Sequence, residues 1–206
     1  MIFKTICVGP MQVNCYVLAC AENSPALIID PGDEYDLIKA VIDRYKLKPA
    51  LVINTHGHYD HIGCDNNFDL PVYVHSGDKT MLEQAELNLS AFFSEPLKVN
   101  SEIRLLKDKQ LIKLDCIELE VLHTPGHTTG GISLLMKKPE RNILFTGDTL
   151  FCQSVGRTDM PGGNQPALKK SIQEKLMVLP DDLIIYPGHG KPSTIGEERM
   201  HNPFLS

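Results

Sequence analysis

The segment THGHYDHIG, residues 55–63, places three histidines and an aspartate within six positions. His56 and His58 are one residue apart, so in an extended segment both side chains point the same way and can bind one cation. Asp60 and His61 lie just beyond and turn away if a helix begins there, which suits a second cation. The segment therefore predicts two neighbouring metal sites, because packing alone does not readily explain four such residues together.

Three more ligand-type residues follow apolar runs at glycine-marked turns: His127 in HTPGHTTGG, Asp148 in LFTGDTLF and His189 in IIYPGHGKP. Loops held by a rigid sheet commonly carry function. Alone, Asp148 could cap a helix and His189 could be a buried hydrogen-bond donor. Their joint occurrence favours two ligand sets with Asp148 as the bridge; the sets are His56, His58 and His127, and Asp60, His61 and His189.

The remaining histidines are expected to serve other roles. His75 and His201 are expected to be structural, and His123 is expected to support the loop that carries His127.

Such ligand sets indicate metal-assisted hydrolysis. Protein ligands leave each cation short of a full shell, so a water or hydroxide can complete it. Two divalent cations lower the pKa of that water, polarise a carbonyl or phosphoryl oxygen and stabilise the developing charge. Asp60, which would also orient the nucleophile, and the bridging Asp148 are the expected catalytic residues. Zn²⁺ is the expected metal, although Fe, Mn or Co also suits these ligands.

Composition narrows the class of protein. The 206 residues favour one domain, 1–206, and the content of 42% hydrophobic and 22% charged residues is typical of globular chains. The formal net charge of −6 offers no basic surface for nucleic acid. No signal-peptide pattern and no window of membrane-spanning length occurs, so we expect a cytoplasmic protein with no nucleic acid or membrane partner.

Six cysteines are scattered through the chain without C-x-x-C spacing, and in a reducing cytosol this favours free thiols over a disulfide framework. Most are expected to be small buried hydrophobic residues. They are Cys7, Cys15, Cys20, Cys64, Cys116 and Cys152.

Apolar patterning predicts the elements that position the ligand loops. Helical spacing predicts a surface helix within 33–49, a longer helix from about 77 to 93 and an amphipathic helix within 165–180. Short apolar runs closed by turn residues predict strands within 2–8, 14–21, 26–32, 50–56, 71–76, 116–127, 131–138, 142–151 and 182–189. Two strand-rich halves with amphipathic helices predict an α/β fold, a four-layer αββα sandwich.

The ligand pattern resembles that of the metallo-β-lactamase-fold hydrolase family, whose signature H-x-H-x-D-H stands here at residues 56–61. His127, Asp148 and His189 match the later ligand positions, and the resemblance runs over nearly the whole chain. PGHTTGGISL, GDTLFCQSVGRTD and PGHGKPSTIGEERMHNPFL are similar to the short bacterial type II glyoxalases, which are hydroxyacylglutathione hydrolase-like proteins. The resemblance implies the αββα fold, a site at one edge of the sandwich and cleavage of a thioester such as S-lactoylglutathione.

Departures separate the relatives within that family. Its exported two-zinc β-lactamases usually carry Cys where Asp148 stands, and flavodiiron proteins carry Glu at the position of His58 together with a flavin domain. Ribonuclease Z relatives carry an RNA-gripping insertion, which the acidic balance of this chain does not support. A thioester hydrolase remains the best match.

The thiol carrier is left open by the sequence. Full-length type II glyoxalases add a helical C-terminal region that binds glutathione, whereas 17 residues follow His189 here. Arg157 and Lys191 are the basic residues nearest the ligand motifs and could face an anionic substrate. Arg157 could equally pair with Asp159 to hold its own loop.

Two rival functions remain beside a hydrolase that acts on a small-molecule thioester. An iron-dependent persulfide dioxygenase of the same fold would hold one Fe(II) on His56 or His58, His127 and Asp148. A non-enzymatic metal or thiol sensor would use Cys64 or Cys152, which lie near ligand loops. Seven intact ligand positions favour an enzyme over a sensor, and no sequence feature indicates an oligomeric state.

Overall fold

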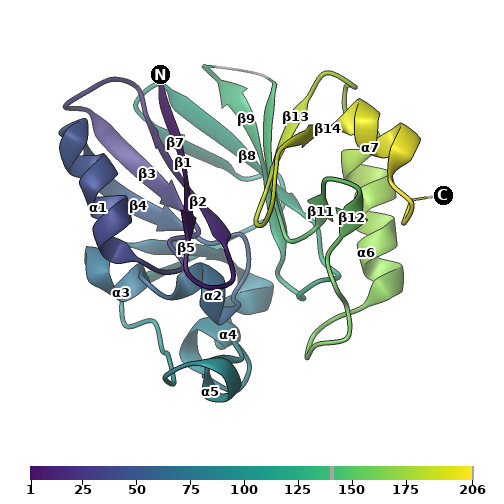
Figure 1. The fold of residues 1–206 in the computed structure, drawn as a ribbon, viewed down its shortest axis with the longest axis horizontal. Helices are drawn as coiled ribbons and strands as arrows, with labels where there is room; N and C mark the ends of the chain where they lie inside the picture. Colours follow the sequence, from purple (N-terminus) through teal and green to yellow (C-terminus); the bar gives the residue numbers. More distant parts are fainter. Residues whose placement is uncertain (140–141, 206) are drawn as a thin grey trace.

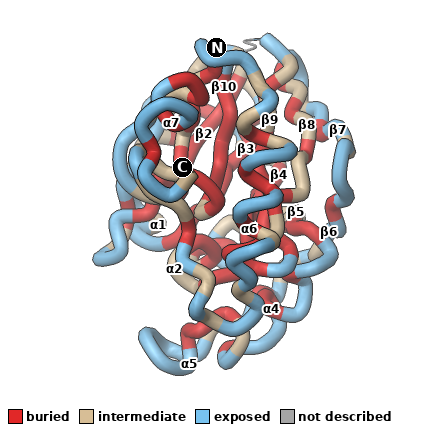
Figure 2. The backbone as a smooth tube through the Cα atoms, turned by 90° about the vertical axis from the view of Figure 1, so that its right-hand side faces the viewer, coloured by how far each residue is buried: buried red, intermediate tan, exposed pale blue. Residues whose placement is uncertain are grey.

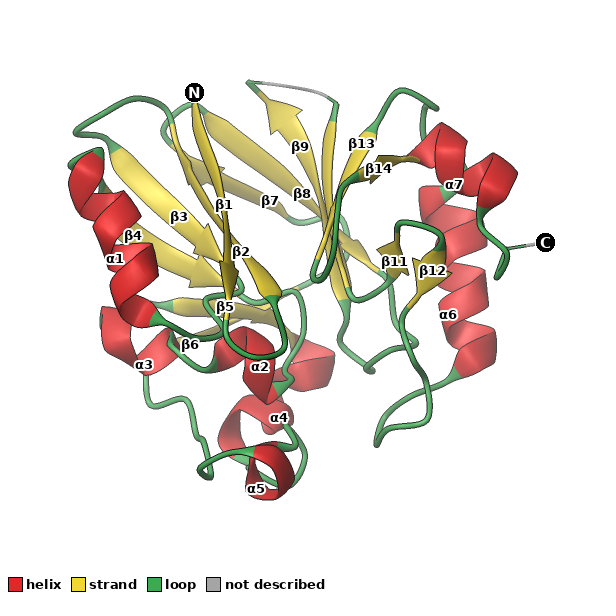
Figure 3. Ribbon diagram, viewed as in Figure 1, coloured by secondary structure: helices red, strands yellow, loops and turns green. Residues whose placement is uncertain are grey.

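A computed structural model of the chain describes residues 1–139 and 142–205 (Figure 1). Two six-stranded sheets lie face to face, with strand orders β1-β2-β3-β4-β5-β6 and β14-β13-β10-β9-β8-β7. Helices cover the outer face of each sheet (Figure 3). The predicted four-layer αββα sandwich is confirmed.

The first sheet begins as an antiparallel meander and continues as parallel strands. β1, β2 and β3 pair antiparallel, and β3 to β6 pair parallel. Parallel neighbours need a crossover, and helix α1 (Tyr35–Arg44) supplies it between β3 and β4. The strands are β1 (Ile2–Val8), β2 (Val13–Ala19), β3 (Pro25–Ile29), β4 (Lys48–Ile53), β5 (Val72–His75) and β6 (Ile103–Leu106).

The second sheet mirrors this arrangement. β10 and β13 pair parallel, with helix α6 (Gln165–Ser171) and the π-helical segment η2 (Ile172–Leu176) between them. The other neighbours pair antiparallel, and helix α7 (Ile195–His201) follows the sheet. The strands are β7 (Leu111–Leu114), β8 (Ile117–His123), β9 (Ile132–Lys138), β10 (Ile143–Gly147), β13 (Ile184–Pro187) and β14 (Ser193–Thr194); β11 (Leu150–Phe151) and β12 (Ser154–Val155) form a separate ribbon.

Strand β2 shows how the sandwich is packed, because all seven of its residues are buried. Alternate side chains point to opposite faces of a strand. Val17 therefore packs with Ile38 of α1 in the outer core, whereas Leu18 packs with Phe145 in the core between the sheets. Figure 2 shows the same pattern along the backbone, with buried strands inside and exposed helical segments outside. Among the described residues, no helix has the length and apolar character needed to cross a membrane.

The prediction of one long helix from about residue 77 to 93 is wrong. A buried asparagine interrupts it: the Asn88 side-chain amide donates to the carbonyl oxygens of Met81 and Leu97, so Met81 is capped by a side chain. Leu89 then adopts a left-handed backbone conformation with φ of 73°, which ends any continuous helix. The segment instead forms η1 (Ser76–Asp78), α4 (Lys79–Glu83) and α5 (Ser90–Phe93), and two further short helices are α2 (Tyr59–Ile62) and α3 (Asp65–Phe68).

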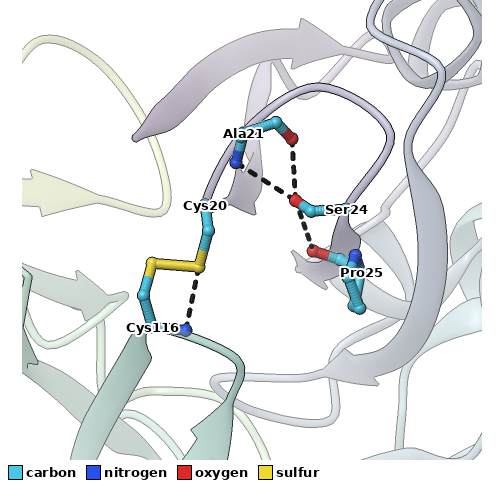
Figure 4. Close-up of a disulfide and its surroundings, with 5 residues drawn as sticks. All are labelled: Cys20, Ala21, Ser24, Pro25 and Cys116. Carbon is cyan, nitrogen blue, oxygen red and sulfur yellow. Dashed lines mark hydrogen bonds between the residues drawn. A yellow bond between two sulfur atoms is a disulfide. The ribbon is translucent and has the colours of Figure 1, made fainter.

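The expectation of free thiols is wrong for two cysteines. Cys20 and Cys116 form a disulfide with their Cα atoms 5.8 Å apart, and the Cys116 amide also donates to the Cys20 sulfur (Figure 4). Cys20 follows β2 and Cys116 lies in the turn between β7 and β8, so the bond joins the two sheets. A separation of 96 residues leaves no local spacing signal. The free cysteines are Cys7, Cys15, Cys64 and Cys152.

Reduction of this disulfide is expected to lower the free energy of unfolding by about 2–4 kcal/mol, because the bond closes a long loop in the unfolded chain. Denaturant titration with and without reductant measures the loss. Cys20→Ser/Cys116→Ser should show the same loss and no response to reductant, whereas the exposed Cys7→Ser should behave as the parent. A double variant as stable as the oxidised parent would contradict the assignment.

Candidate metal centre

Loops from both sheets meet at one edge of the sandwich. The segment after β4 carries His56 and His58 and then enters α2, which carries Asp60 and His61. In the second sheet the ligand-type residues follow β8, β10 and β13 in turn. The structure therefore brings all seven predicted residues together: His56, His58, Asp60, His61, His127, Asp148 and His189.

Their ligand atoms form overlapping groups of three, each within 4.8 Å of one another. The groups are His56, His58 and His127; Asp60, His61 and His189; and His56, His61 and Asp148. The first two are the sets predicted from the sequence.

Asp148 faces both sets. Its Oδ1 lies 3.5 Å from His61 Nε2, and its Oδ2 lies 3.6 Å from His127 Nε2 and 3.5 Å from His189 Nε2. A carboxylate in this position can contact two cations at once, as the bridging role requires.

A glycine allows the last loop to approach. A Cβ on Gly188 would lie 2.1 Å from Asp148 Oδ1 and 2.8 Å from His61 Cε1, so any side chain here would displace the cluster. The Gly188 carbonyl also accepts a hydrogen bond from the Asn14 amide at the start of β2, at 2.7 Å. The sequence YPGH thus brings the His189 backbone against the other sheet.

Hydrogen bonds orient three of the imidazoles. His127 Nδ1 donates to the Arg157 carbonyl at 2.7 Å, and His189 Nδ1 donates to the Met11 carbonyl at 2.9 Å. His61 Nδ1 donates to Asp30 Oδ2 at 3.0 Å. In each case Nε2 is left to face the cluster, which is how partner groups typically fix metal-binding histidines.

His58 is oriented the other way. Its Nδ1 lies 2.9 Å from His127 Nε2. The Nδ1 atom of His58 is therefore the one that faces the first ligand set.

Asp30 is a buried hub that the sequence analysis missed. Its Oδ1 accepts from the Thr55 amide at 2.7 Å, and its Oδ2 accepts from the Thr55 hydroxyl at 2.7 Å and from His61. One carboxylate therefore ties the end of β3 to the start of the histidine segment. The signal was present in IIDPG, since Asp30 follows a buried strand at a Gly-marked turn as the ligand residues do.

Asp78 is a second missed hub, and it joins the two halves of the site. Its carboxylate accepts from the Gly57 amide at 3.1 Å, the Thr128 hydroxyl at 2.6 Å and the Gly130 amide at 2.5 Å. Gly57 lies between His56 and His58, and Thr128 follows His127. Asp78 therefore holds the first-sheet histidine segment in register with the second-sheet loop, yet its own sequence context, SGD, carries no comparable signal.

Asp30, Asp60 and Asp148 make the side of the cluster around His61 strongly attractive to positive charge. Burial disfavours the charged form of His61, but Asp148, Asp30 and Asp60 outweigh it and raise the pKa of His61 to about 10. Burial opposes ionisation of Asp60 as well, yet His61 and His189 hold the pKa of Asp60 well below its usual range.

The pKa values of His56 and His58 are shifted in the opposite direction to that of His61. Burial and the surrounding imidazoles lower the pKa of His56 well below its usual value, and burial together with His127 lowers the pKa of His58 to about 3. Both rings are therefore neutral near pH 7, the state in which imidazole binds a metal.

The residues fit two divalent cations. Within the described part of the chain, His56 Nε2 and Asp148 Oδ1 are buried without a hydrogen-bond partner. Such atoms are costly unless a ligand satisfies them. The mixed imidazole and carboxylate donor set suits Zn²⁺, Fe, Mn or Co.

The two basic residues proposed for substrate contact behave differently. Arg157 lines the cavity above the cluster, but its guanidinium donates to both carboxylate oxygens of Asp159, at 2.7 and 2.8 Å. Lys191 is exposed and does not line that cavity.

His123 supports its loop as expected. Its Nε2 donates to the Thr129 carbonyl at 3.0 Å, and its ring stacks on His75 with the centroids 3.8 Å apart.

A cavity of about 470 Å³ opens over the cluster. Asp60, His127, Asp148 and His189 line its floor, and most of its walls are apolar side chains. This volume suits a small-molecule substrate with its reacting group on the ligand cluster.

Residues 8–189 match the model of the metallo-beta-lactamase superfamily, and the chain belongs to that family. It is 41% identical to an uncharacterised protein of Mycobacterium tuberculosis, over 96% of this chain and 94% of that one. It is 36% identical to a probable metallo-hydrolase, YqgX, of Bacillus subtilis, over 100% and 98% of the two chains. It is 35% identical to the hydroxyacylglutathione hydrolase GloC of Haemophilus influenzae, over 100% and 99%.

Solved structures agree with this family assignment. The B3 metallo-beta-lactamase BLEG-1 superposes with a TM-score of 0.92 at 38% identity, over the full length of both chains. TTHA1623 in a di-iron-bound form gives 0.84 at 35% identity, over 98% of this chain and 100% of that one. ETHE1 from Myxococcus xanthus gives 0.79 at 27% identity, over 98% and 84%. The class is therefore a metallo-hydrolase of this superfamily with a His/Asp metal-binding cluster.

Asp30→Asn is expected to weaken Zn²⁺ affinity about 10- to 100-fold, because the amide cannot replace the charged acceptor that orients His61. Competition with a chromophoric chelator measures the affinity. The exposed Asp36→Asn serves as a matched control with unchanged affinity. Equal affinities for the two variants would show that Asp30 does not act through His61.

Cation binding at pH 8 is expected to release about one proton or more per chain, because His61, with a pKa of about 10, is protonated in the metal-free protein. Calorimetry in two buffers of different ionisation enthalpy counts the protons, and zero protons would contradict the assignment.

The raised pKa of His61 also stabilises the metal-free fold. This contribution is complete below pH 6.5 and is lost as the pH rises toward 10.

Proposed function

We propose that this chain is a binuclear metal-dependent hydrolase that cleaves a small-molecule thioester, with S-lactoylglutathione as the reference substrate. The observation that carries the proposal is the pair of three-residue ligand groups at the floor of a cavity, with the Asp148 carboxylate 3.5–3.6 Å from histidines of both groups. His56, His58 and His127 would hold one cation, and Asp60, His61 and His189 the other. Similarity to GloC, named as a hydroxyacylglutathione hydrolase, supports the thioester class.

Two divalent cations, when bound, lower the pKa of a water molecule and polarise the substrate carbonyl. The chain supplies the positioning. Asp60 lines the cavity and stays ionised, so its carboxylate can accept a hydrogen bond from the attacking water and orient it. Apolar walls exclude bulk water from the reacting carbonyl. The leaving thiolate has a pKa near 8.5 in general, so the site needs no strong acid.

A second candidate is an iron-dependent persulfide dioxygenase of the same fold. Two histidines and one carboxylate, as Fe(II) oxygenases use, form one ligand group in His56, His61 and Asp148. The set expected from the sequence has His127 in place of His61, and His127 Nε2 lies 3.6 Å from Asp148 Oδ2. The similarity to TTHA1623 in a di-iron-bound form supports iron as a metal for such a site. Because the chain is similar to the B3 metallo-beta-lactamase BLEG-1, β-lactam amides are also substrates to test.

The proposed location is the cytoplasm, with no nucleic acid or membrane partner. The Cys20–Cys116 bond bears on this location, because disulfides persist mainly in oxidising compartments. Alkylation of thiols in intact cells tests the proposed location. If Cys20 and Cys116 resist alkylation there, the chain lies in an oxidising compartment instead.

Protein purified without added metal is expected to carry two divalent cations per chain, chiefly zinc, and to release thiol from S-lactoylglutathione. Asp148→Ala should lose cation occupancy and lower kcat/KM by about 10³-fold or more, because it removes the shared ligand. Elemental analysis and a thiol-release assay measure both quantities, and Asp182→Ala, an exposed aspartate, is the control.

Three results would change this proposal. Retained two-metal occupancy in Asp148→Ala would overturn the bridging role. One iron per chain with oxygen uptake on glutathione persulfide would favour the dioxygenase. Turnover of a β-lactam without thioester cleavage would favour an amide hydrolase.

A further inference from the structure

The cavity over the cluster has predominantly apolar walls. Six of the side chains that line it are leucine, valine, methionine or phenylalanine. They come from separate segments around its mouth: the β1–β2 turn, α5 and the residue before it, the β11–β12 ribbon and the loop that follows. They are Met11, Leu89, Phe93, Phe151, Val155 and Met160.

The walls, as far as the described residues form them, carry no lysine or arginine side chain that is free of an acidic partner. Among the described residues that line this cavity and the adjoining one of about 370 Å³, Arg157 is the one lysine or arginine. Both of its hydrogen bonds to Asp159 are charge-assisted, and the two side chains hold each other in a forked pair. The adjoining cavity adds Asp33 and Glu95.

This distribution of charge is unfavourable for an anionic thiol carrier. Glutathione carries two carboxylates and one ammonium group, and a buried carboxylate needs a cationic or hydrogen-bonding partner. Cations held by the ligand cluster would be engaged by their ligands and by the reacting carbonyl. An uncharged apolar group instead gains free energy for each methylene that the walls bury.

We infer that the cavity binds an uncharged apolar group attached directly to the scissile bond, and that Phe93 and Met160 form the wall that selects it. This inference rests on the proposed thioester hydrolase and names its substrate class. The group is either a medium-length acyl chain or an apolar thiol carrier, since both present the same chemistry to the walls.

Phe92 and Phe93 provide a matched pair for the test. Both lie in α5 and both are largely exposed, at 66% and 63%, but only Phe93 lines the cavity. Its ring stacks beside Tyr59, with the centroids 6.2 Å apart. Both alanine changes remove the same exposed side chain from the same short helix, so a difference between the two variants reports on the cavity wall that Phe93 forms beside Tyr59.

The substrate comparison uses the metal-loaded protein and four thioesters, with a lactoyl or hexanoyl group on glutathione or on uncharged N-acetylcysteamine. We expect kcat/KM to rise about tenfold when hexanoyl replaces lactoyl on one thiol, or when N-acetylcysteamine replaces glutathione under one acyl group. The first result assigns the cavity to the acyl chain and the second to the carrier. S-lactoylglutathione as the best substrate would overturn the inference while leaving the hydrolase intact.

A binding measurement separates failure of the inference from failure of the proposed function. Calorimetry with the thioethers S-hexylglutathione and S-methylglutathione needs no turnover. We expect the hexyl compound to bind about tenfold more tightly, and Phe93→Ala and Met160→Ala to remove this difference while Phe92→Ala retains it. Equal affinities for the two thioethers in the parent, or equal effects of Phe92→Ala and Phe93→Ala, would overturn the inference even if no thioester is cleaved.

Asp159→Asn tests the role of the paired guanidinium. Release of Arg157 should raise kcat/KM for the anionic S-lactoylglutathione about three- to fivefold and change that for S-lactoyl-N-acetylcysteamine less than twofold. A variant with no gain for the anionic substrate would show that the pairing of Arg157 does not exclude anions.

Discussion

Burial of imidazoles and carboxylates against one another is the constraint on which this structure depends. His56, His58, His61 and His127 are each at most 6% exposed. The Nε2 atoms of His61 and His127 face carboxylate oxygens at 3.5–3.8 Å. Without cations, this arrangement requires a proton on His61 and neutral rings at His56 and His58. Two cations would satisfy the unpaired atoms directly, so the electrostatics of the cluster and the proposed chemistry have the same physical origin.

The sandwich brings the ligand residues together because strands of both sheets end at the same edge. The first sheet delivers four of the seven ligand residues from a single continuous segment, and the second delivers the other three from three loops. Asp30 fixes that segment to its own sheet, whereas Asp78 fixes it to the loop of His127. These two buried carboxylates contact no part of the cavity, yet they determine the register between its halves.

The local spacing of residues predicted the ligand residues of the site but few of the residues that hold them in place. The segment 56–61 was recognisable because its ligands are close in sequence, and Asp148 and His189 because each follows an apolar run at a glycine. Asp78 and the Cys20–Cys116 bond depend on contacts between distant segments. The break at Asn88 depends on its side-chain hydrogen bonds to Met81 and Leu97, and no apolar periodicity records any of these contacts. The family model and the structural likeness to BLEG-1 confirm the sandwich that the strand and helix patterns predicted.

The position of the disulfide has a mechanical consequence. Cys20 lies at the end of β2 opposite to Val13, which pairs with His189, and Cys116 precedes β8, whose far end leads to His127. The covalent bond therefore fastens the two sheets at the edge away from the ligand loops, and cations shared between the loops would fasten the opposite edge. Such a sandwich is joined at both edges. Loss of the cations would leave the ligand edge to the hydrogen bonds of Asp78 and of Asn14 with Gly188, while the other edge keeps its covalent bond.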